Sequence, residues 1–288
     1  MTFTIEKILQ MYKDGKMEKE EAEMHIRSLG FLSVSDIAKI DTFRCKRTGV
    51  LEAVLAEGKS DDDLINILKQ FTKSKDRVLV TRVSEKQYES IKEEKDLRII
   101  DSGRYNKTLV VGPNFDSNES FESKLNDESK KNDENEEFSD FSDFSEISGR
   151  VAIITAGTAD IPVAEEAAMT ARETGCKTYE LYDVGVAGYQ RLLIELDKLN
   201  SFDPDAIVVA AGREGTLPTV VAGILDAPVI GLPVSTGYGI GSNGKAAFYS
   251  MIQSCSVITV VNIDAGFVAG AYAAKIANRA KRQRMGKS

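Results

Sequence analysis

The strongest constraint on this chain is a repeated alternation of apolar runs and helix-like segments after residue 150. The apolar runs lie near residues 151–155, 178–182, 206–211, 228–232 and 257–261. The helix-like segments follow them near residues 162–174, 189–200, 216–225, 244–254 and 266–282. Strands that alternate with helices in this way form a parallel sheet with helices on both faces. We therefore predict an α/β domain with a three-layer, doubly wound parallel sheet over residues 149–288.

The first 113 residues predict a second, smaller α/β domain. Hydrophobic periodicity indicates two short helices at 4–13 and 17–29. Beyond them we expect helices near 60–72 and 84–94 and strands near 77–81, 97–100 and 107–111. Residues 114–148 are mostly Ser, Asn, Asp and Glu, a composition that cannot bury enough apolar surface to offset chain entropy. We expect this acidic tract to be a disordered linker or a surface insertion.

Charge and hydropathy exclude several classes of partner. The formal charge is −8, but the acidic tract alone carries twelve acidic residues against three lysines, which leaves the rest of the chain close to neutral. A nearly neutral folded part does not attract nucleic acid. The apolar runs are too short to span a bilayer, and the first residues lack the basic and apolar segments of a secretion signal. We expect a cytoplasmic protein with no membrane partner.

The cysteine and histidine content narrows the chemistry. Cys45, Cys176 and Cys255 have no paired spacing, so we expect three free thiols and neither a disulfide framework nor a cysteine metal site. His25 is the only histidine and falls in a predicted N-terminal helix, where a packing or surface role is the simpler interpretation. Acid–base chemistry in the larger domain is therefore left to Asp, Glu, Lys, Tyr or Cys.

Ligands of doubly wound sheets bind beyond the carboxyl ends of the strands, so the loops there are the candidate site. Glu214 lies between glycines after the third strand, where a general base can be presented. Glycine, Ser and Thr after the first and fourth strands offer backbone N–H groups to phosphate or carboxylate oxygens. A basic loop near Arg44 and Arg47 could also hold an anion, although a solvated loop explains it equally. The candidate substrate-binding residues are Arg44, Arg47, Gly157, Thr158, Asp160, Gly212, Ser235, Thr236, Gly237, Gly239, Asn262 and Asp264.

The order of these motifs resembles a known family. The segments 156–160, 211–218, 229–234 and 262–264 together look like the LarB family, whose C-terminal domain is similar to the purine-biosynthesis carboxylase PurE. The stretches 41–49 and 57–59 resemble its N-terminal region, so the resemblance covers nearly the whole chain except the acidic tract. One departure is that this chain has Ala265 and Val268 where the family usually has Asn and Gly, which could alter the contacts of that loop.

The resemblance implies a pyridinium-3,5-biscarboxylic acid mononucleotide synthase. Such an enzyme carboxylates C5 of the pyridinium ring of nicotinic acid adenine dinucleotide with CO2 or bicarbonate as co-substrate. It also hydrolyses the phosphoanhydride and releases AMP, the first step of nickel-pincer nucleotide biosynthesis. The covalent cysteine of the family falls on Cys255 and its base on Glu214. A divalent ion, Mg or Zn, is expected to assist, with Asp160 or Asp264 as candidate ligands.

The chemistry gives an independent reason for these residue types. A pyridinium ring is electron-poor and does not attack CO2, whereas a thiolate adduct is a dihydropyridine with a nucleophilic enamine carbon at C5. A base must then remove the C5 proton so that the thiolate leaves and the ring becomes aromatic again. Cysteine serves both as nucleophile and as leaving group. The ring carbon that the thiolate attacks stays open.

Two alternatives remain at this point. One is a non-catalytic nucleotide-sensing module, in which the glycine loops bind ligand and the acidic tract recruits a partner. The other is a PurE-type aminoimidazole ribonucleotide carboxylase or mutase, which the lack of histidine from 150 to 288 disfavours because that family works with a histidine in its sheet-end loops. Similarity to PurE also implies a homo-oligomer, with an octamer as one option.

Overall fold

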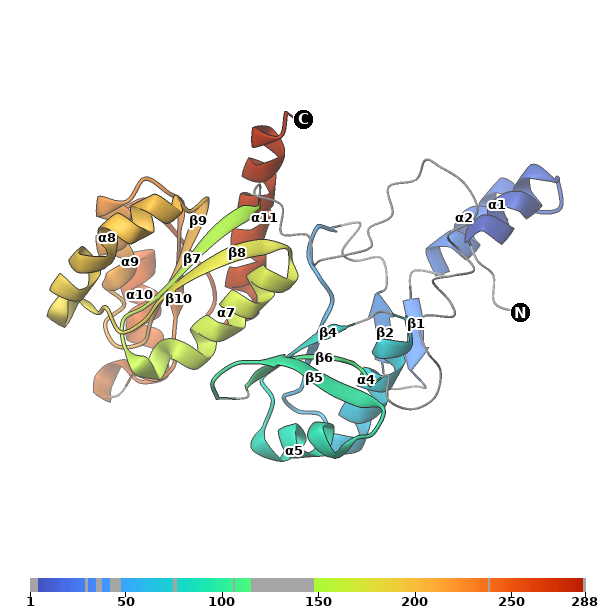
Figure 1. Cartoon of the computed structure of the whole chain (residues 1–288), viewed down its shortest axis with the longest axis horizontal. Helices are drawn as coiled ribbons and strands as arrows, with labels where there is room; N and C mark the ends of the chain where they lie inside the picture. The colour runs from blue at the N-terminus through green and yellow to red at the C-terminus, as the bar shows by residue number, and fades with distance from the viewer. Residues whose placement is uncertain are drawn as a thin grey trace. The chain divides into compact units, whose positions relative to one another are not determined.

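The computed structural model describes residues 5–28, 31–34, 38–41, 48–74, 77–105, 107–114, 148–237 and 239–286 (Figure 1). The chain divides into two compact units. The first comprises Met1–Asp101 with Val110–Pro113, and the second comprises Ser102–Leu109 with Asn114–Ser288. The predicted acidic linker lies almost entirely outside the described residues, so its disorder stays a prediction.

The first unit contains the elements expected from periodicity and three short strands that were not expected. Its helices are α1 (Ile5–Lys13), α2 (Lys19–Ser28), α4 (Asp61–Ser74) and α5 (Glu85–Glu93). Its strands are β1 (Phe31–Val34), β2 (Ala38–Asp41), β3 (Ala53–Leu55), β4 (Val78–Thr81), β5 (Leu97–Ser102) and β6 (Thr108–Pro113). β1 and β2 form an antiparallel pair, and the other four form a sheet in the order β3-β4-β6-β5.

Local sequence explains where these helices begin. Ser84 and Gln87 form a capping box in which each side chain accepts a backbone N–H of the other, and this fixes the start of α5. Three aspartates, Asp61 to Asp63, occupy the first turn of α4, where the helix dipole favours negative charge. Leu64 and Leu68 of the same helix are buried and anchor it to the unit's core.

The second unit has the predicted alternation of strands and helices. Its strands are β7 (Gly149–Thr155), β8 (Cys176–Leu181), β9 (Ala206–Ala211), β10 (Val229–Pro233) and β11 (Ile258–Val260). Its helices are α7 (Ile161–Glu173), α8 (Gln190–Phe202), α9 (Leu217–Ile224), α10 (Lys245–Ile252) and α11 (Gly266–Arg284). Short 3₁₀ turns cover Thr158–Asp160, Val186–Gly188 and Gly239–Gly241. The strands are parallel in the order β11-β10-β9-β7-β8.

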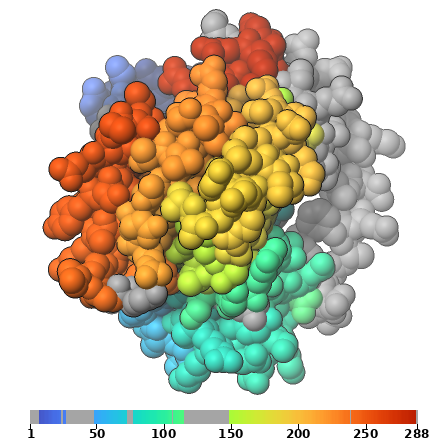
Figure 2. Space-filling model, turned by 90° about the vertical axis from the view of Figure 1, so that its left-hand side faces the viewer, coloured from blue at the N-terminus to red at the C-terminus, as the bar shows by residue number. Residues whose placement is uncertain are grey.

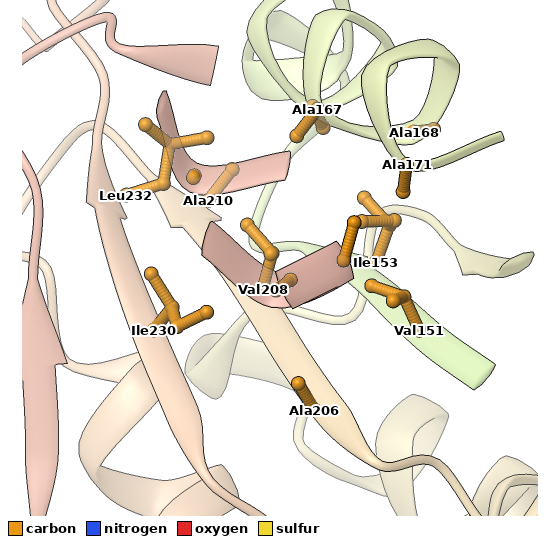
Figure 3. Close-up of a cluster of buried hydrophobic side chains, with 14 of the residues drawn as sticks. Val151, Ile153, Ala167, Ala168, Ala171, Ala206, Val208, Ala210, Ile230 and Leu232 are labelled. Carbon is orange, nitrogen blue, oxygen red and sulfur yellow. The ribbon is translucent and has the colours of Figure 1, made fainter. Parts of the chain in front are cut away.

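Helices cover both faces of this sheet, which confirms the three-layer prediction. On one face, Val151, Ile153 and Val208 pack with alanines of α7 and α11 (Figure 3). On the other face, Ile154 and Val209 pack with side chains of α8, α9 and α10. β9 is buried along its whole length, as its unbroken apolar sequence AIVVAA requires of a central parallel strand.

Small residues let α11 approach α7 closely. A Cβ added at Gly270 would lie 2.3 Å from the carbonyl oxygen of Ala167, and one at Gly266 would lie 2.4 Å from that of Val163. These distances are far below van der Waals contact, so only glycine fits at either position. The two helices therefore form a rigid layer behind β7 and β9.

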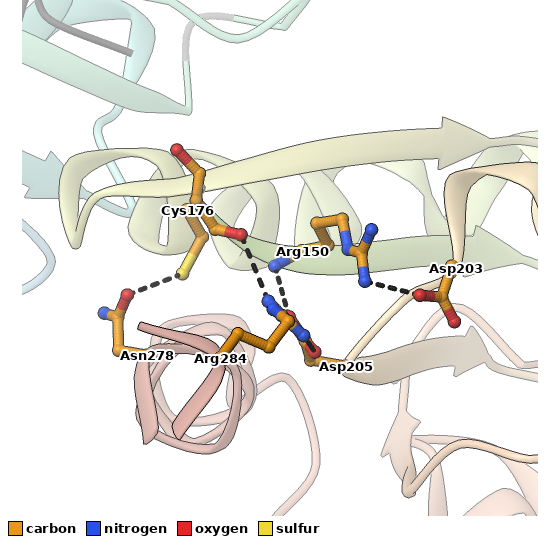
Figure 4. A network of polar contacts seen from close by, with 7 residues as sticks. Arg150, Cys176, Asp203, Asp205, Asn278 and Arg284 are labelled. Atoms are coloured by element: carbon orange, nitrogen blue, oxygen red, sulfur yellow. Dashed lines mark hydrogen bonds and ion pairs between the residues drawn. The ribbon is translucent and has the colours of Figure 1, made fainter. Parts of the chain in front are cut away.

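A polar network closes the amino ends of the central strands (Figure 4). Asp205, which begins the approach to β9, accepts the backbone N–H of Arg150 in β7 at 2.8 Å and pairs with Arg284 at the end of α11. Arg150 also pairs with Asp203. At the basic end of α11, Arg284 thus has a structural partner in Asp205.

The topology places a crevice at the opposite edge of the sheet. β7 lies between β8 and β9, so the connections after β7 and β9 leave the sheet in opposite directions, and ligands bind at such a switch point.

In the described part of the chain, every helix is too short or too polar to cross a membrane.

Candidate active site

A cavity of about 260 Å³ lies at the carboxyl ends of β7, β8, β9 and β10. The loops after all four strands contribute to its wall, as the doubly wound topology requires. Its lining residues are Ala156, Gly157, Ala159, Asp160, Gly185, Val186, Ala187, Arg191, Ala211, Arg213, Glu214, Gly215, Thr216, Leu217, Thr236 and Gly237. The cavity therefore brings together residues from three of the segments that the sequence singled out.

Asp160 is the buried polar centre of this cavity. The residue is 5% exposed, and its Oδ2 accepts the backbone N–H of Gly157 at 2.9 Å. Its Oδ1 accepts the hydroxyl of Thr236 at 3.1 Å. Burial raises the pKa of the Asp160 carboxyl, and the hydrogen bonds from Gly157, Thr236 and the Gly212 backbone offset part of that rise. The carboxylate thus ties the loops after β7, β9 and β10 together.

Two glycines allow these loops to approach so closely. A Cβ at Gly212 would lie 2.5 Å from Thr236 Oγ1 and 2.9 Å from Asp160 Oδ1. A Cβ at Gly237 would lie 2.3 Å from the carbonyl oxygen of Gly212. The predicted substrate-binding glycines at 212 and 237 therefore have a packing role that is sufficient to explain them, although Gly237 also lines the cavity.

Glu214 lies at the exposed rim of the cavity. It follows β9 in the turn that leads to α9, beside Arg213 and before Gly215, whose φ of +66° is left-handed. A Cβ at Gly215 would also collide with the backbone of Ala247 in α10. The turn is therefore held firmly, while the Glu214 carboxylate remains open to solvent and to a ligand.

Asp264 and Ser235 join two neighbouring loops outside the cavity lining. Asp264 Oδ1 accepts the Ser235 N–H at 2.8 Å, and the Asp264 N–H donates to the carbonyl of Pro233 at 2.9 Å. Asp264 has a φ of +55°. Asn262 is exposed, and its Oδ1 accepts the N–H of Ile263. Of the remaining candidates, Thr158 and Gly239 also lie outside the lining.

Cys255 lies in the turn between α10 and β11. It is exposed, whereas Cys176 is buried and burial raises the pKa of the Cys176 thiol to about 12. The serines on either side of Cys255 fix the turn to α9: Ser254 Oγ is 2.8 Å from Thr219 Oγ1, and Ser256 Oγ donates to the Thr219 carbonyl. Within one chain, Cys255 is not part of the cavity that contains Glu214.

The loop after β8 and the start of α8 supply cavity residues that were not predicted from the sequence. Gly185, Val186 and Arg191 line the cavity, and Arg191 pairs with Asp183. The signal was available, because this loop follows a strand of the same parallel sheet, but its residues form no glycine-rich or acidic motif. In a doubly wound sheet the loop after every strand is a candidate for ligand binding, so topology alone predicts that this loop contributes.

Two parts of the prediction are not tested by the residues that the structure describes. Arg44 and Arg47 lie outside the described residues, so their role stays a prediction. Among the residues that the structure does describe, no three His, Cys, Asp or Glu side chains gather as a metal site. Asp160 already accepts hydrogen bonds on both oxygens, and Asp264 accepts one from Ser235. Asp160 and Asp264 therefore do not provide a complete set of protein ligands for a divalent ion.

Comparison with known proteins covers both units. A family model described as the LarB/PurE-like N-terminal domain matches residues 32–107, and one described as AIR carboxylase matches residues 150–287. The chain is 35% identical over 277 residues to the uncharacterized protein MJ0165 of Methanocaldococcus jannaschii, which spans 94% of this chain and 95% of that protein.

Two further proteins match a shorter part of the chain. The chain is 33% identical over 115 residues to the N5-carboxyaminoimidazole ribonucleotide mutase of Thermotoga maritima, covering 40% of this chain and 65% of the mutase. Among solved structures, Treponema denticola PurE is 19% identical with a TM-score of 0.37, covering 48% of this chain and 89% of PurE.

Proposed function

This chain belongs to the LarB family, and on that premise we propose that it is a pyridinium-3,5-biscarboxylic acid mononucleotide synthase. Its C-terminal domain is of the AIR carboxylase type, which places it among carboxylases and mutases. The observation that carries the finer proposal is the pairing of a LarB-type N-terminal domain with a carboxylase-type domain in which an exposed glutamate lines the sheet-end cavity. The substrate is nicotinic acid adenine dinucleotide, and the products are the biscarboxylated mononucleotide and AMP.

The reaction uses one thiolate and one carboxylate. The Cys255 thiolate adds to a pyridinium carbon ortho or para to the ring nitrogen, and C5 becomes an enamine carbon. C5 then forms a bond to CO2. Glu214 takes the C5 proton, the C–H electron pair returns to the ring, and the C–S pair leaves with sulfur. Water hydrolyses the phosphoanhydride, and AMP departs.

The position of Cys255 adds a requirement to this mechanism. A thiolate and a base that act on one ring must both touch it, yet Cys255 is exposed outside the cavity that Glu214 lines. We propose that the protein is a homo-oligomer in which the α10–β11 turn of one copy reaches the cavity of another. The exposed apolar side chains Tyr249, Ile252 and Val257 around that turn suit a surface covered by a second copy.

We propose that a divalent ion binds together with the substrate. Mg²⁺ is commonly held by one or two carboxylates together with substrate phosphates, so the described residues need not form a complete cage. No step above is assigned to it. The basic residues Arg44 and Arg47 are proposed to approach the substrate's carboxylate or phosphates.

The test is to incubate the purified protein with nicotinic acid adenine dinucleotide, bicarbonate and Mg²⁺ and to identify the products by mass spectrometry. We expect AMP and a mononucleotide that is heavier by one carboxyl group, with both carboxylation and turnover lost in Cys255→Ala. A Cys176→Ala protein is the matched control, because that thiol is buried in the core and should leave the products unchanged. AMP without carboxylation would reduce the proposal to a hydrolase.

Subunit complementation tests the composite site. Cys255→Ala and Glu214→Gln chains, each inactive alone, should regain carboxylation when they are co-expressed, because some assemblies then combine an intact thiol with an intact carboxylate. Activity that never returns in a mixed assembly would show that each chain supplies both groups to its own site.

The mutase alternative has a specific point in its favour, which is the similarity of the second unit to a mutase. Against this alternative, the C-terminal domain has no imidazole for catalysis, since His25 is the only histidine and belongs to α2. Turnover of a carboxyaminoimidazole ribonucleotide by this protein would favour that function. Ligand binding without turnover of either substrate would favour a nucleotide-sensing module.

A further inference from the structure

Helix α11 has an exposed face that carries only apolar and basic side chains. Its buried face packs Ala269, Ala273 and Ala277 against the sheet, and exposed positions recur every three or four residues on the other side. These exposed residues, which we call the outer stripe, are Val268, Tyr272, Lys275, Arg279 and Arg282. The helix contains no acidic residue. Figure 2 shows its end (deep red) at the surface.

The cations of the outer stripe have no carboxylate partner among the residues that the structure describes. Arg284 of the same helix differs from them, because it pairs with Asp205. Arg282 donates from Nε to the carbonyl of Asn278 at 3.4 Å, which leaves its charge uncompensated. Like charges three and four residues apart on a helix repel one another. An acidic segment along the stripe would therefore relieve this repulsion and form several ion pairs at once.

The acidic tract joins the second unit beside this helix. The carbonyl of its last residue, Ser148, accepts a hydrogen bond from Arg284 Nη2 at 3.3 Å. A Cβ added at Gly149 would lie 2.9 Å from the backbone of Ala277, so the start of β7 runs against α11. Residues 138–147, FSDFSDFSEI, directly precede Ser148 and contain three phenylalanines, three acids and no basic residue. A segment tethered next to a surface has a high effective concentration for it.

The segment is also long enough to follow the outer stripe. α11 rises about 1.5 Å per residue, so Val268 lies about 24 Å along the helix from Arg284. Ten residues of extended chain span at most about 33–36 Å. Residues 138–147 can therefore reach from the basic end of the stripe to its apolar end.

We propose that residues 138–147 dock on the outer stripe of α11 in the same chain. Their three carboxylates pair with the cations of the stripe, and their phenylalanines cover Tyr272 and Val268. Each exposed ion pair is weak and is screened by salt, so the contact depends on several pairs and on the tether acting together. This docking does not depend on the reaction proposed above.

Limited proteolysis of the full-length protein with chymotrypsin, followed by mass spectrometry, measures the docking. Chymotrypsin cleaves after phenylalanine, so the phenylalanines of residues 138–147 report on the docked segment, and Phe121 in the same tract is an internal reference. We expect the triple variant Lys275→Gln/Arg279→Gln/Arg282→Gln to speed up cleavage within 138–147, relative to cleavage at Phe121, by about three- to tenfold. Raising NaCl to about 0.5 M should have the same effect on the wild type.

A matched control removes three exposed cations away from α11. Lys86→Gln/Lys92→Gln/Lys198→Gln should leave the relative cleavage rates unchanged. A tract variant that keeps the phenylalanines, Asp140→Asn/Asp143→Asn/Glu146→Gln, should behave like the triple variant of α11. Relative cleavage that is the same in the wild type and in the α11 variant would overturn the inference.

Carbodiimide cross-linking identifies the chain that supplies the segment, because it joins carboxylates to lysines and Lys275 is the one lysine of the outer stripe. We expect a peptide containing 138–147 to be linked to Lys275 in the band of single-chain mass on a denaturing gel, and the link to be lost at high salt. Links to Lys275 only in a band of two-chain mass would show that a second copy covers the stripe, and would also overturn the inference.

Discussion

Gly212 offers a sharp test of how the cavity is assembled. A Cβ at this position would lie 2.5 Å from Thr236 Oγ1, 2.9 Å from Asp160 Oδ1 and 3.0 Å from the carbonyl oxygen of Val234. Asp160 cannot retreat without losing the Gly157 N–H, whereas the Thr236 hydroxyl can rotate away. We therefore expect Gly212→Ala to break the hydrogen bond from Thr236 to Asp160.

The magnitude follows from two contributions. A methyl group forced into a packed site costs about 1–3 kcal/mol, and part of this is relieved when Thr236 rotates. Loss of a hydrogen bond to a charged group costs about 1.5–3 kcal/mol, and the carboxylate that loses it is buried. Allowing for the relief, Gly212→Ala should lower the free energy of unfolding by about 2–4 kcal/mol.

Urea denaturation followed by circular dichroism measures this change. Gly223→Ala is the control, because a Cβ at Gly223 meets no atom within 4 Å and the residue lies in α9, where alanine is the better helix former. The double mutant Gly212→Ala/Thr236→Ala should be less destabilised than the sum of its two single mutants, since removal of the hydroxyl makes room for the methyl. A Gly212→Ala protein within about 0.5 kcal/mol of the wild type would refute the packing argument.

Two further predictions concern ionisable groups. Iodoacetamide at pH 8 should alkylate Cys255 in the native protein but spare Cys176 until the protein unfolds, because burial raises the pKa of the Cys176 thiol to about 12. Peptide mapping by mass spectrometry distinguishes the two cysteines. Equal labelling of both would contradict the structure. Burial raises the pKa of the Asp160 carboxyl above its unfolded value, so ionisation of Asp160 opposes folding. The free energy of unfolding of Asp160→Asn should therefore rise relative to that of the wild type as pH increases from about 3 to about 7. Denaturation at each pH measures that difference, and the opposite slope would show that hydrogen bonding outweighs burial.

The second unit's fold could be predicted because its physical signals are local and repeated. Apolar runs such as AIVVAA and the amphipathic segments between them fix the elements, and the handedness of parallel crossovers fixes the layers. The short strands β1, β2 and β3 were not predicted. Strands of three or four residues carry too little periodicity to be recognised before their partners are known.

The candidate site was predictable only in part. Sheet topology brings Gly157, Asp160, Glu214 and Thr236 to one edge, as the post-strand loops suggested. Ser235 and Asp264 instead form a hydrogen bond with each other. This contact was not predicted, because a hydrogen bond between two loops has no sequence signature. Arg191 was overlooked for a related reason, since its position depends on Asp183 and Gly188 rather than on a motif.

The two carboxylates of the cavity differ in what their surroundings allow them to do. Both oxygens of Asp160 accept hydrogen bonds from groups on three loops, so its lone pairs are already committed to holding those loops together. A base must instead present an uncommitted oxygen to the proton that it removes, at hydrogen-bond distance. Glu214 stands exposed at the rim on a turn that Gly215 fixes against α10. In a domain without histidine, this difference supports the proposal that Asp160 holds the site together and that Glu214 transfers the proton.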